Sequence, residues 1–381
     1  MLHLDNSLSG LAAAFDGQDK TFSAAWTVLR TAISEHVFPA ASVAVTRCGR
    51  LIALKALGRF AYEGDSARVE ATSLFDLASL TKVVATTTMV MTLYERGLLE
   101  LDAPILGTIP EFLVDSCGES DPRRRNVTFR MLLAHSSGLP AYEKLFLKAR
   151  SRDELLRAAC TMPLAADPGS RAEYSDIGFI ILGVALERLA DGTSDDSVAR
   201  FCQREIFGPL AMSSTTFSPP QELRGRIPPT ADDRTFRNRI IQGEVQDENA
   251  SILGGVAGHA GLFSTAGDLA RFAHCMLQGG TPVLLPETVA LFARRESTPA
   301  GTSRALGWDT PSQPSQSGKY FGPRSYGHLG YTGTSLWIDP DRQLSVTLLT
   351  NRTWPDGSNQ AIKQVRPKFH DAILEALPKE S

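Results

Sequence analysis

The spacing of hydrophobic positions predicts a helix followed by a pair of strands at the start of the chain. Apolar residues recur with helical periodicity over residues 22–36. Two β-rich runs follow at residues 41–46 and 51–57, and residues 47–50 between them have the composition of a tight turn. This part of the chain therefore predicts an antiparallel hairpin that begins a sheet.

A second pattern covers residues 79–96, where apolar side chains occupy most faces of the segment. Its Val and Thr residues would suit a strand, but a run of this length without interruption favours a buried helix. Arg96 and Gly97 provide a cationic last turn and a C-cap. We therefore expect a buried helix that starts at Ser79.

Helical patterns dominate the middle of the chain, and strands return near its end. Helix-like segments lie at residues 152–160, 177–190, 197–207, 266–277 and 286–293, strand-like runs at 335–338 and 344–349, and a last helix at 359–377. The predicted fold class is α/β (α+β), with an antiparallel sheet flanked by helices. Residues 1–97 and 286–381 would form the sheet lobe and residues 98–285 a mostly helical lobe, with the active site in the cleft between them.

Composition is that of an ordinary globular protein. The 381 residues suffice for two packed regions, and 43% hydrophobic content, 21% charged residues and a net charge of -3 predict no nucleic-acid partner. We expect Arg123, Arg124 and Arg125, the longest basic run, to form a solvated loop. The pattern does not indicate an oligomeric state.

The N-terminus and the cysteines bear on location. Asp5 and Asp16 fall where a secretory signal would avoid acidic residues, so we expect a cytoplasmic protein. The apolar run at residues 179–186 is much shorter than the roughly 20 residues of a spanning helix, so no stable membrane insertion is predicted. The five cysteines are scattered without C-x-x-C spacing, so we expect reduced structural thiols, no metal and no cofactor.

Ser79-Leu80-Thr81-Lys82 is the only Ser-x-x-Lys segment of the chain. On a helix this spacing puts Ser79 and Lys82 on one face. A serine hydroxyl needs a neighbouring group to become a nucleophile, and burial would lower the pKa of Lys82 toward a neutral base. The alternative is an N-cap serine beside a solvated lysine.

Tyr174-Ser175-Asp176 follows the Pro168-Gly169 turn and precedes an apolar helix. A tyrosine in such a connection can point into a cleft, and its phenol can relay a proton if nearby cations lower its pKa from about 10. Alternatively, Tyr174 is a packing residue and Asp176 an ordinary N-cap.

Residues 327–333 are rich in glycine and precede a β-rich run. Glycines let a substrate backbone approach a strand closely and pair with its edge. His328 would then face the cleft, although a structural histidine is the simpler alternative.

In this order, the three motifs resemble those of the penicillin-recognising serine hydrolases, most closely the branch with class C β-lactamases, D-alanyl-D-alanine carboxypeptidases and related esterases. Residues 79–82 resemble the family's S-x-x-K, residues 174–176 its Y-x-N with Asp in place of Asn, and residues 328–330 the H-x-G that replaces K-T-G in many members that are not lactamases. Residues 133–140 resemble the segment that shapes the cleft rim, and residues 258–270 a run ahead of a family helix.

The resemblance implies a role for each matched residue. Ser79 would attack the carbonyl, Lys82 and Tyr174 would share the proton transfers, and hydrolysis would pass through an acyl-Ser79 intermediate. The backbone N–H groups of Ser79 and Tyr331 would form the oxyanion hole. His328 would hold the polar end of the substrate or stabilise the tyrosinate.

Two departures from the family pattern bear on the substrate. Asp176 replaces a neutral amide, so a hydrogen-bond donor is lost and a negative charge can be added. His328-Leu329-Gly330 replaces a permanent cation with a group of ordinary pKa about 6.5. We therefore expect Asp176, His328 and Gly330 to contact the substrate, and we expect weak or no β-lactamase activity.

Residues 244–259 are similar to a subgroup associated with peptidoglycan fragments, which includes muramoyl-L-alanine amidase-like members. The resemblance makes Asp247, Glu248 and His259 candidates for the pocket, and we add Tyr142. Alternatively, the acidic residues form a solvated turn.

Three interpretations therefore remain open. The favoured one is a serine hydrolase acting on a small-molecule ester or amide. A narrower one is a muropeptide amidase or D-alanyl-D-alanine carboxypeptidase, and one of another class is a non-catalytic peptidoglycan- or penicillin-binding module. A binder has no need of Ser79, Lys82 and Tyr174 together, and the chain contains no G-x-S-x-G nucleophile elbow.

Overall fold

The computed structural model describes residues 11–190 and 197–378. Residues 1–10, which carry part of the argument about a leader, lie outside the described residues. The main sheet has six strands in the order β1-β3-β2-β11-β10-β9. Its strands are β1 (Ala12–Ala13), β2 (Ala40–Arg47), β3 (Arg50–Gly58), β9 (Tyr326–Leu329), β10 (Ser335–Asp339) and β11 (Leu344–Thr350).

N- and C-terminal segments meet inside this sheet. β2 pairs with β11, and every ladder except the short parallel one between β1 and β3 is antiparallel. Cys48 and Gly49 both have positive φ, 47° and 73°, in the turn between β2 and β3, as a tight hairpin requires. The predicted antiparallel sheet from both ends of the chain is confirmed.

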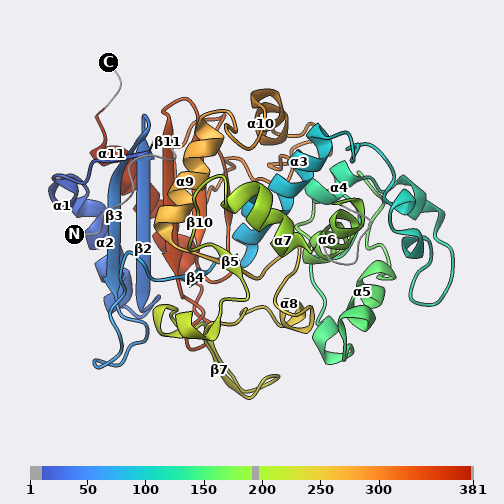
Figure 1. Cartoon of the computed structure of the whole chain (residues 1–381), viewed down its shortest axis with the longest axis horizontal. Coiled ribbons are helices and arrows are strands. Elements are labelled where there is room, and N and C mark those ends of the chain that lie inside the picture. Colours follow the sequence, from blue (N-terminus) through green and yellow to red (C-terminus); the bar gives the residue numbers. More distant parts are fainter. Residues whose placement is uncertain (1–10, 191–196, 379–381) are drawn as a thin grey trace.

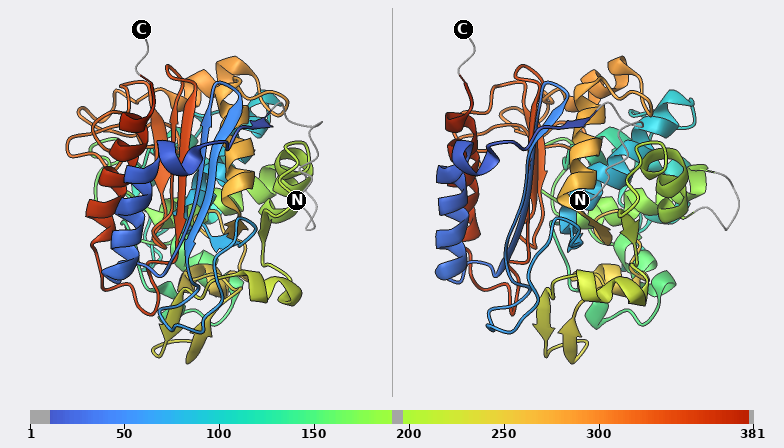
Figure 2. Two further views of the ribbon diagram at one scale, coloured as in Figure 1. Left: turned by 90° about the vertical axis from the view of Figure 1, so that its left-hand side faces the viewer. Right: turned by 60° about the vertical axis from the view of Figure 1, so that its left-hand side comes forward.

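Helices cover both faces of the sheet (Figures 1 and 2). α2 (Ser23–Ser34) and α11 (Ile362–Ala376) pack side by side on one face, and α9 (Ala266–Leu277) lies on the other, against β2 and β11. The division into two lobes stays a prediction. α9 contacts the sheet although it belongs to the segment expected to form the helical lobe.

The remaining elements form a mostly helical region beside α9 (Figure 1). The α-helices of this region are α3 (Thr88–Glu95), α4 (Phe129–Leu133), α5 (Arg152–Cys160), α6 (Asp176–Ala190), α7 (Val198–Cys202), α8 (Glu248–Ile252) and α10 (Pro286–Ala293). The short α1 (Gln18–Thr21) lies beside the sheet. Short turns of other helix types are Ala78–Leu80, Lys82–Thr87, Ile105–Gly107, Pro110–Leu113, Pro122–Asn126, Leu145–Leu147, Gln203–Phe207 and Gln221–Arg226. Two small sheets, β4 (Phe75–Asp76) with β8 (Leu262–Ser264) and β5 (Thr216–Phe217), and β6 (Ala231–Asp233) with β7 (Arg239–Ile241), are too short for a sequence pattern to predict.

The buried helix predicted at residues 79–96 is present but not uniform. A 3-10 turn, η1 (Ala78–Leu80), is followed by a π-helical turn, η2 (Lys82–Thr87), and then by α3. The Thr88 hydroxyl donates to the carbonyl of Val83, five residues earlier, at 2.9 Å. This hydrogen bond joins the π-helical turn to the first residue of α3. Single π-helical turns are common at functional sites.

The basic run at residues 123–125 is not a solvated loop throughout, which corrects the prediction. Arg124 is 0% exposed, and its guanidinium donates to the backbone carbonyls of Phe112 and Cys160 at 2.9 and 3.0 Å. A helix end leaves carbonyls without partners, so Cys160, the last residue of α5, offers an acceptor that the local sequence does not reveal.

Across the described ranges, no helix is both long and apolar enough to span a membrane.

Candidate active site

One cavity of about 700 Å³ brings the predicted residues together. It is lined by Ser79, Tyr142, Tyr174, Asp176, Asp247, Glu248, His259, His328, Gly330 and Tyr331, together with residues that the sequence did not indicate. Lys82 lies behind this lining and is 0% exposed. The cavity is lined by segments from the sheet edge, the turn at Ser79, the start of α6, the region around α8 and the first turns of α11.

Lys82 has three hydrogen-bond acceptors, one for each ammonium proton. Nζ donates to Ser79 Oγ at 2.9 Å, to Asp176 Oδ1 at 2.7 Å and to the backbone carbonyl of His259 at 3.1 Å. The tight η1 turn puts Ser79 and Lys82 side by side. The alternative of an N-cap serine beside a solvated lysine is wrong, because Lys82 is buried and Ser79 caps no helix.

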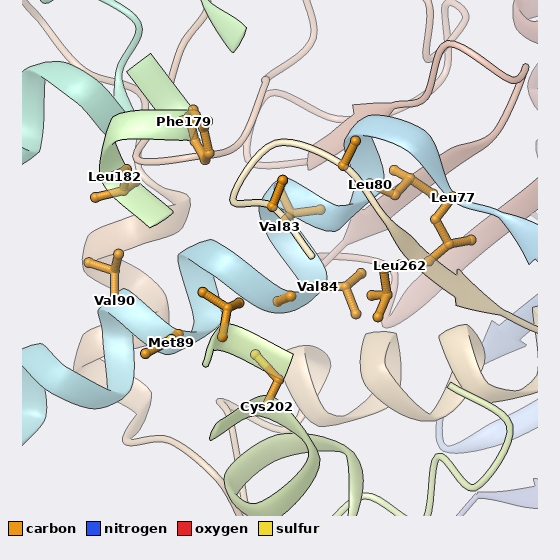
Figure 3. Packing of buried hydrophobic residues seen from close by; sticks show 14 of the residues in the cluster. Leu77, Leu80, Val83, Val84, Met89, Val90, Phe179, Leu182, Cys202 and Leu262 are labelled. Carbon is orange, nitrogen blue, oxygen red and sulfur yellow. The ribbon is translucent and has the colours of Figure 1, made fainter. Parts of the chain in front are cut away.

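Lys82 is fully buried, and its Nζ lies 5.5 Å from the centre of the Phe179 ring. Figure 3 shows Leu80, Val83 and Val84 packed among side chains from other segments, including Phe179 and Leu262. Burial alone lowers the pKa of Lys82, but the Asp176 carboxylate and Tyr174 raise it more, so the net shift is upward. The expectation that burial makes Lys82 a neutral base is therefore wrong for the resting site, where Lys82 is an ammonium.

Tyr174 stands beside Lys82, whose Nζ lies 4.9 Å from the centre of its ring. Burial raises the pKa of Tyr174, and Asp176 raises it further, while Lys82 and Ser79 lower it; the net shift is upward. A pKa lowered by nearby cations, the condition given for a proton relay, is therefore not met in the resting site. The phenol is neutral in the resting site and can donate a proton.

Asp176 is the counter-ion of Lys82 and not the cap of α6. The capping bond comes from Ser175, whose Oγ accepts from the backbone N–H of Gly178 at 3.0 Å. The Asp176 side chain is 19% exposed and reaches both Lys82 and the cavity. The carboxylate that departs from the family pattern therefore contacts the charge at the centre of the site.

His328 lies on the edge strand β9 and is 3% exposed. Its Nδ1 donates to the carbonyl of Leu329 at 2.8 Å, which leaves Nε2 as a buried acceptor without a partner in the described structure. Burial, together with the charges of Lys82 and Arg304, holds the pKa of His328 well below 6.5. His328 is therefore neutral from about pH 6 to 8, and the permanent cation of the family pattern is absent over this whole range.

Gly330 and Tyr331 follow β9 at the mouth of the cavity. A side chain at Gly330 would put its Cβ 2.0 Å from Thr334 Oγ1 and 2.4 Å from the Leu77 carbonyl, so only glycine fits against the Ser79 turn. The backbone N–H groups of Ser79 and Tyr331 donate no hydrogen bond to another residue in the described ranges. Two such donors are what an oxyanion requires.

The wall beside α8 is acidic and does not form a solvated turn. Asp247 Oδ1 accepts from the Ala250 N–H at 2.7 Å and pairs with His259 Nε2 at 2.9 Å. Glu248 also lines the cavity, and burial raises its pKa. Tyr142, with 40% of its surface exposed, lies at the rim, and burial raises its pKa.

Three arginines line the cavity although the sequence gives no signal for them. Arg304 lies 5.4 Å from the centre of the Tyr174 ring, within a stretch rich in Ser, Pro and Gly. Arg352 and Arg366 are 5% and 4% exposed and donate mainly to backbone carbonyls. The lining of the cavity therefore contains cationic side chains as well as acidic ones.

His135 is a further buried residue of the site, from the segment expected to shape the cleft rim. It is 2% exposed, and its Nδ1 accepts from the backbone N–H of Ser175 at 3.0 Å. Its ring centre lies 4.6 Å from that of Tyr174. This segment therefore packs against Tyr174, and the following residues, Ala141 and Tyr142, line the cavity.

Over residues 11–190 and 197–378, no cluster of three or more His, Cys, Asp or Glu side chains could hold a metal ion.

Comparison with known proteins finds one matching family model and several relatives that match over most of their length. The family model described as Beta-lactamase matches residues 15–366. The N-acetylmuramyl-L-alanine amidase of Bacillus subtilis (strain 168) is 31% identical over 348 residues, which cover 83% of this chain and 77% of that protein. A protein of Escherichia coli (strain K12) named "Putative D-alanyl-D-alanine carboxypeptidase" is 31% identical over 359 residues, 84% of this chain and 80% of that protein.

Solved structures show the same fold. EstCE1, described as a hydrolase with promiscuous acyltransferase activity, matches with a TM-score of 0.74 at 21% identity, over 93% of this chain and 99% of that chain. At this level of identity the similarity shows the fold alone.

The first prediction concerns the charge of Lys82. In Asp176→Asn the main influence that raises the pKa of Lys82 is lost, so burial dominates and the pKa falls. If neutral Lys82 is the reactive form, the alkaline rise of kcat/KM for a p-nitrophenyl ester will move to lower pH by roughly one unit or more. Asp309→Asn is the control, because Asp309 lines the same cavity but pairs with Arg304, at 3.7 Å. An unshifted rise in Asp176→Asn would contradict the prediction.

Proposed function

The chain belongs to the β-lactamase family, and on that premise we propose that it is a serine hydrolase that cleaves an ester or amide through an acyl-Ser79 intermediate. The observation that carries the proposal is the contact of 2.9 Å between Lys82 Nζ and Ser79 Oγ at the cavity wall. A serine activated by an adjacent amine is the arrangement that nucleophilic catalysis requires.

The proposed acylation begins with a proton shift inside the ion pair. When Lys82 gives one proton to Asp176 along their bond of 2.7 Å, its lone pair can accept the proton of Ser79. Ser79 Oγ then bonds to the substrate carbonyl carbon, and the carbonyl oxygen takes the negative charge between the N–H groups of Ser79 and Tyr331.

Leaving-group departure requires a proton donor, and neutral Tyr174 can supply one. The phenol protonates the leaving oxygen or nitrogen as its bond to the acyl carbon breaks, and Lys82 returns a proton to Tyr174. A water molecule then attacks the acyl-Ser79 ester. Neutral Lys82 accepts one proton of this water and passes it to Ser79 Oγ as the bond between the acyl carbon and Oγ breaks, which releases the acid. Asp176 then returns its proton to Lys82, which restores the ion pair.

The narrower alternative is cleavage of a peptidoglycan fragment by amidase or D-alanyl-D-alanine carboxypeptidase action. The cavity favours it because its lining contains both carboxylates, from Asp247 and Glu248, and the guanidinium groups of three arginines, Arg304, Arg352 and Arg366. Peptides that carry both amino and carboxylate groups have complementary charge. A non-catalytic binding module is the remaining alternative, and it predicts no covalent adduct on Ser79.

β-Lactam hydrolysis is proposed to be weak or absent. Asp176 offers a carboxylate where the family pattern has an amide donor, and His328 is neutral where lactamases have a lysine. A lactam amide oxygen would lose a hydrogen-bond donor at Asp176.

We also propose a cytoplasmic location. Its support is chemical, because Cys48, Cys117, Cys160, Cys202 and Cys275 are all free thiols. Such usage is typical of a reducing compartment.

The second prediction tests the nucleophile. We expect Ser79→Ala and Lys82→Ala each to lower kcat/KM for a p-nitrophenyl ester by about 10³-fold or more, because the two side chains act as one unit. A fluorophosphonate probe with peptide mass mapping should label Ser79 in the wild type and lose that label in Ser79→Ala. Ser137→Ala is the control, since Ser137 is buried and does not line the cavity. Rates near those of the wild type in either site variant would contradict the mechanism.

The third prediction concerns the substrate. Parallel rates on short acyl esters, nitrocefin, D-alanyl-D-alanine peptides and muramoyl peptides should place nitrocefin lowest. Under the narrower alternative, muramoyl or D-alanyl peptides exceed the esters, and Glu248→Gln lowers turnover of the peptide more than turnover of the ester. Nitrocefin turnover equal to that of the best ester would overturn the view of Asp176 and His328.

A further inference from the structure

Asp76 is a buried carboxylate that lies next to the site but does not line the cavity. It ends β4, three residues before Ser79, and is 2% exposed. The mechanism above makes no use of it. A carboxylate buried to this extent is costly unless its oxygens accept strong hydrogen bonds.

Both oxygens of Asp76 accept a backbone N–H, each from a different segment. Oδ1 accepts from Ala78 at 2.8 Å, and Oδ2 accepts from Gln246 at 2.6 Å. The backbone carbonyl of Asp76 also accepts from Thr332 Oγ1 at 2.8 Å. One residue therefore joins the Ser79 turn, the acidic wall of the cavity and the loop that follows Tyr331.

The hydrogen bond from Ala78 to Asp76 stabilises a strained backbone conformation just before Ser79. Ala78 has φ of +46°, a left-handed conformation that costs free energy in a residue with a side chain. Its N–H bond to Asp76 fixes this conformation immediately before the serine. The preceding Leu77 is held by Thr334, whose hydroxyl donates to the Leu77 carbonyl at 2.9 Å.

The second hydrogen bond leads to Lys82 by another route. Gln246 precedes Asp247, whose carboxylate pairs with His259 Nε2 at 2.9 Å. The carbonyl of His259 in turn accepts from Lys82 Nζ at 3.1 Å. Asp76 thus supports the serine through Ala78 and the amine through Gln246, Asp247 and His259.

We propose that Asp76, as a carboxylate, is a positioning residue of the reaction, which holds the Ser79 hydroxyl and the Lys82 amine in the right places relative to each other. This inference rests on the proposed role of Ser79. It extends the motif by a residue that touches neither substrate nor reacting atoms. Only an ionised carboxylate can accept both N–H bonds, since an amide or a protonated acid has a donor on one side.

The charge of Asp76 depends on pH in the range where the enzyme would be assayed. Burial raises the pKa of Asp76 to about 6, Asp247 adds to the rise, and the N–H bonds from Ala78 and Gln246 and the charge of Arg237 oppose it. Phe263 on β8 and Thr332, which also contact Asp76, carry no titratable group. Protonation on moving from pH 7 to 5 breaks one of the two N–H bonds, so kcat should fall over that range.

The experiment measures kcat and KM for p-nitrophenyl butyrate from pH 5 to 9 in the wild type, Asp76→Asn and Asp268→Asn. Asp268 is the matched control: it is 7% exposed and accepts from the Ser214 N–H at 2.8 Å and the Thr215 hydroxyl at 3.0 Å, outside the cavity. We expect Asp76→Asn to lower kcat about 10- to 100-fold, with KM changed less than about threefold, and to lose the acid limb near pH 6. Asp268→Asn should retain that limb.

The outcomes separate this inference from the proposed function. An unchanged kcat and acid limb in folded Asp76→Asn, while Ser79→Ala is inactive, overturns the role of Asp76 alone. If Asp76→Asn does not fold, a second measurement on the wild type takes the place of this variant: the rate at which a fluorophosphonate labels Ser79, followed from pH 7 to 5. A decline from pH 7 to 5 supports the proposal, and a flat rate overturns it. Failure of wild-type Ser79 to react at any pH overturns the nucleophile assignment first.

Discussion

The buried ammonium of Lys82 is the constraint on which the site depends. With no exposed surface, it must find three acceptors inside the protein, and Ser79 Oγ, Asp176 and the His259 carbonyl provide them. A buried charge left without such partners costs several kcal/mol. The segments that carry these acceptors must therefore meet at one point, and their meeting also defines the cavity.

Partners distant in the sequence then set the charge of each group. Asp176 raises the pKa of Lys82 and so keeps its amine protonated in the resting site. His328 stays neutral because burial and the charges of Lys82 and Arg304 all lower its pKa. Tyr174 stays neutral because burial raises its pKa more than Lys82 lowers it. At the centre of the resting site, the Lys82–Asp176 ion pair therefore lies beside neutral Tyr174 and His328.

The sequence predicted the sheet and the main motifs because those signals are local. A Ser-x-x-Lys spacing brings Ser79 and Lys82 together on any helical turn, and alternating runs predict strands. The protonation state of Lys82 was predicted wrongly and the low pKa of His328 was not predicted, because they depend on Asp176, Arg304 and burial, which only the fold brings together. Arg304 lies in an irregular stretch without periodicity, so no sequence pattern marks it as part of the site.

The most direct test is the protonation state of Lys82 in the resting protein. Lysine labelled with ¹⁵N, with the Lys82 signal assigned by its loss in Lys82→Arg, reports whether Nζ carries three protons. We expect an ammonium signal for Lys82 at pH 7 that persists at pH 9, because Asp176 raises its pKa. A neutral amine signal at pH 7 would contradict the account, since Asp176 would then not govern the site.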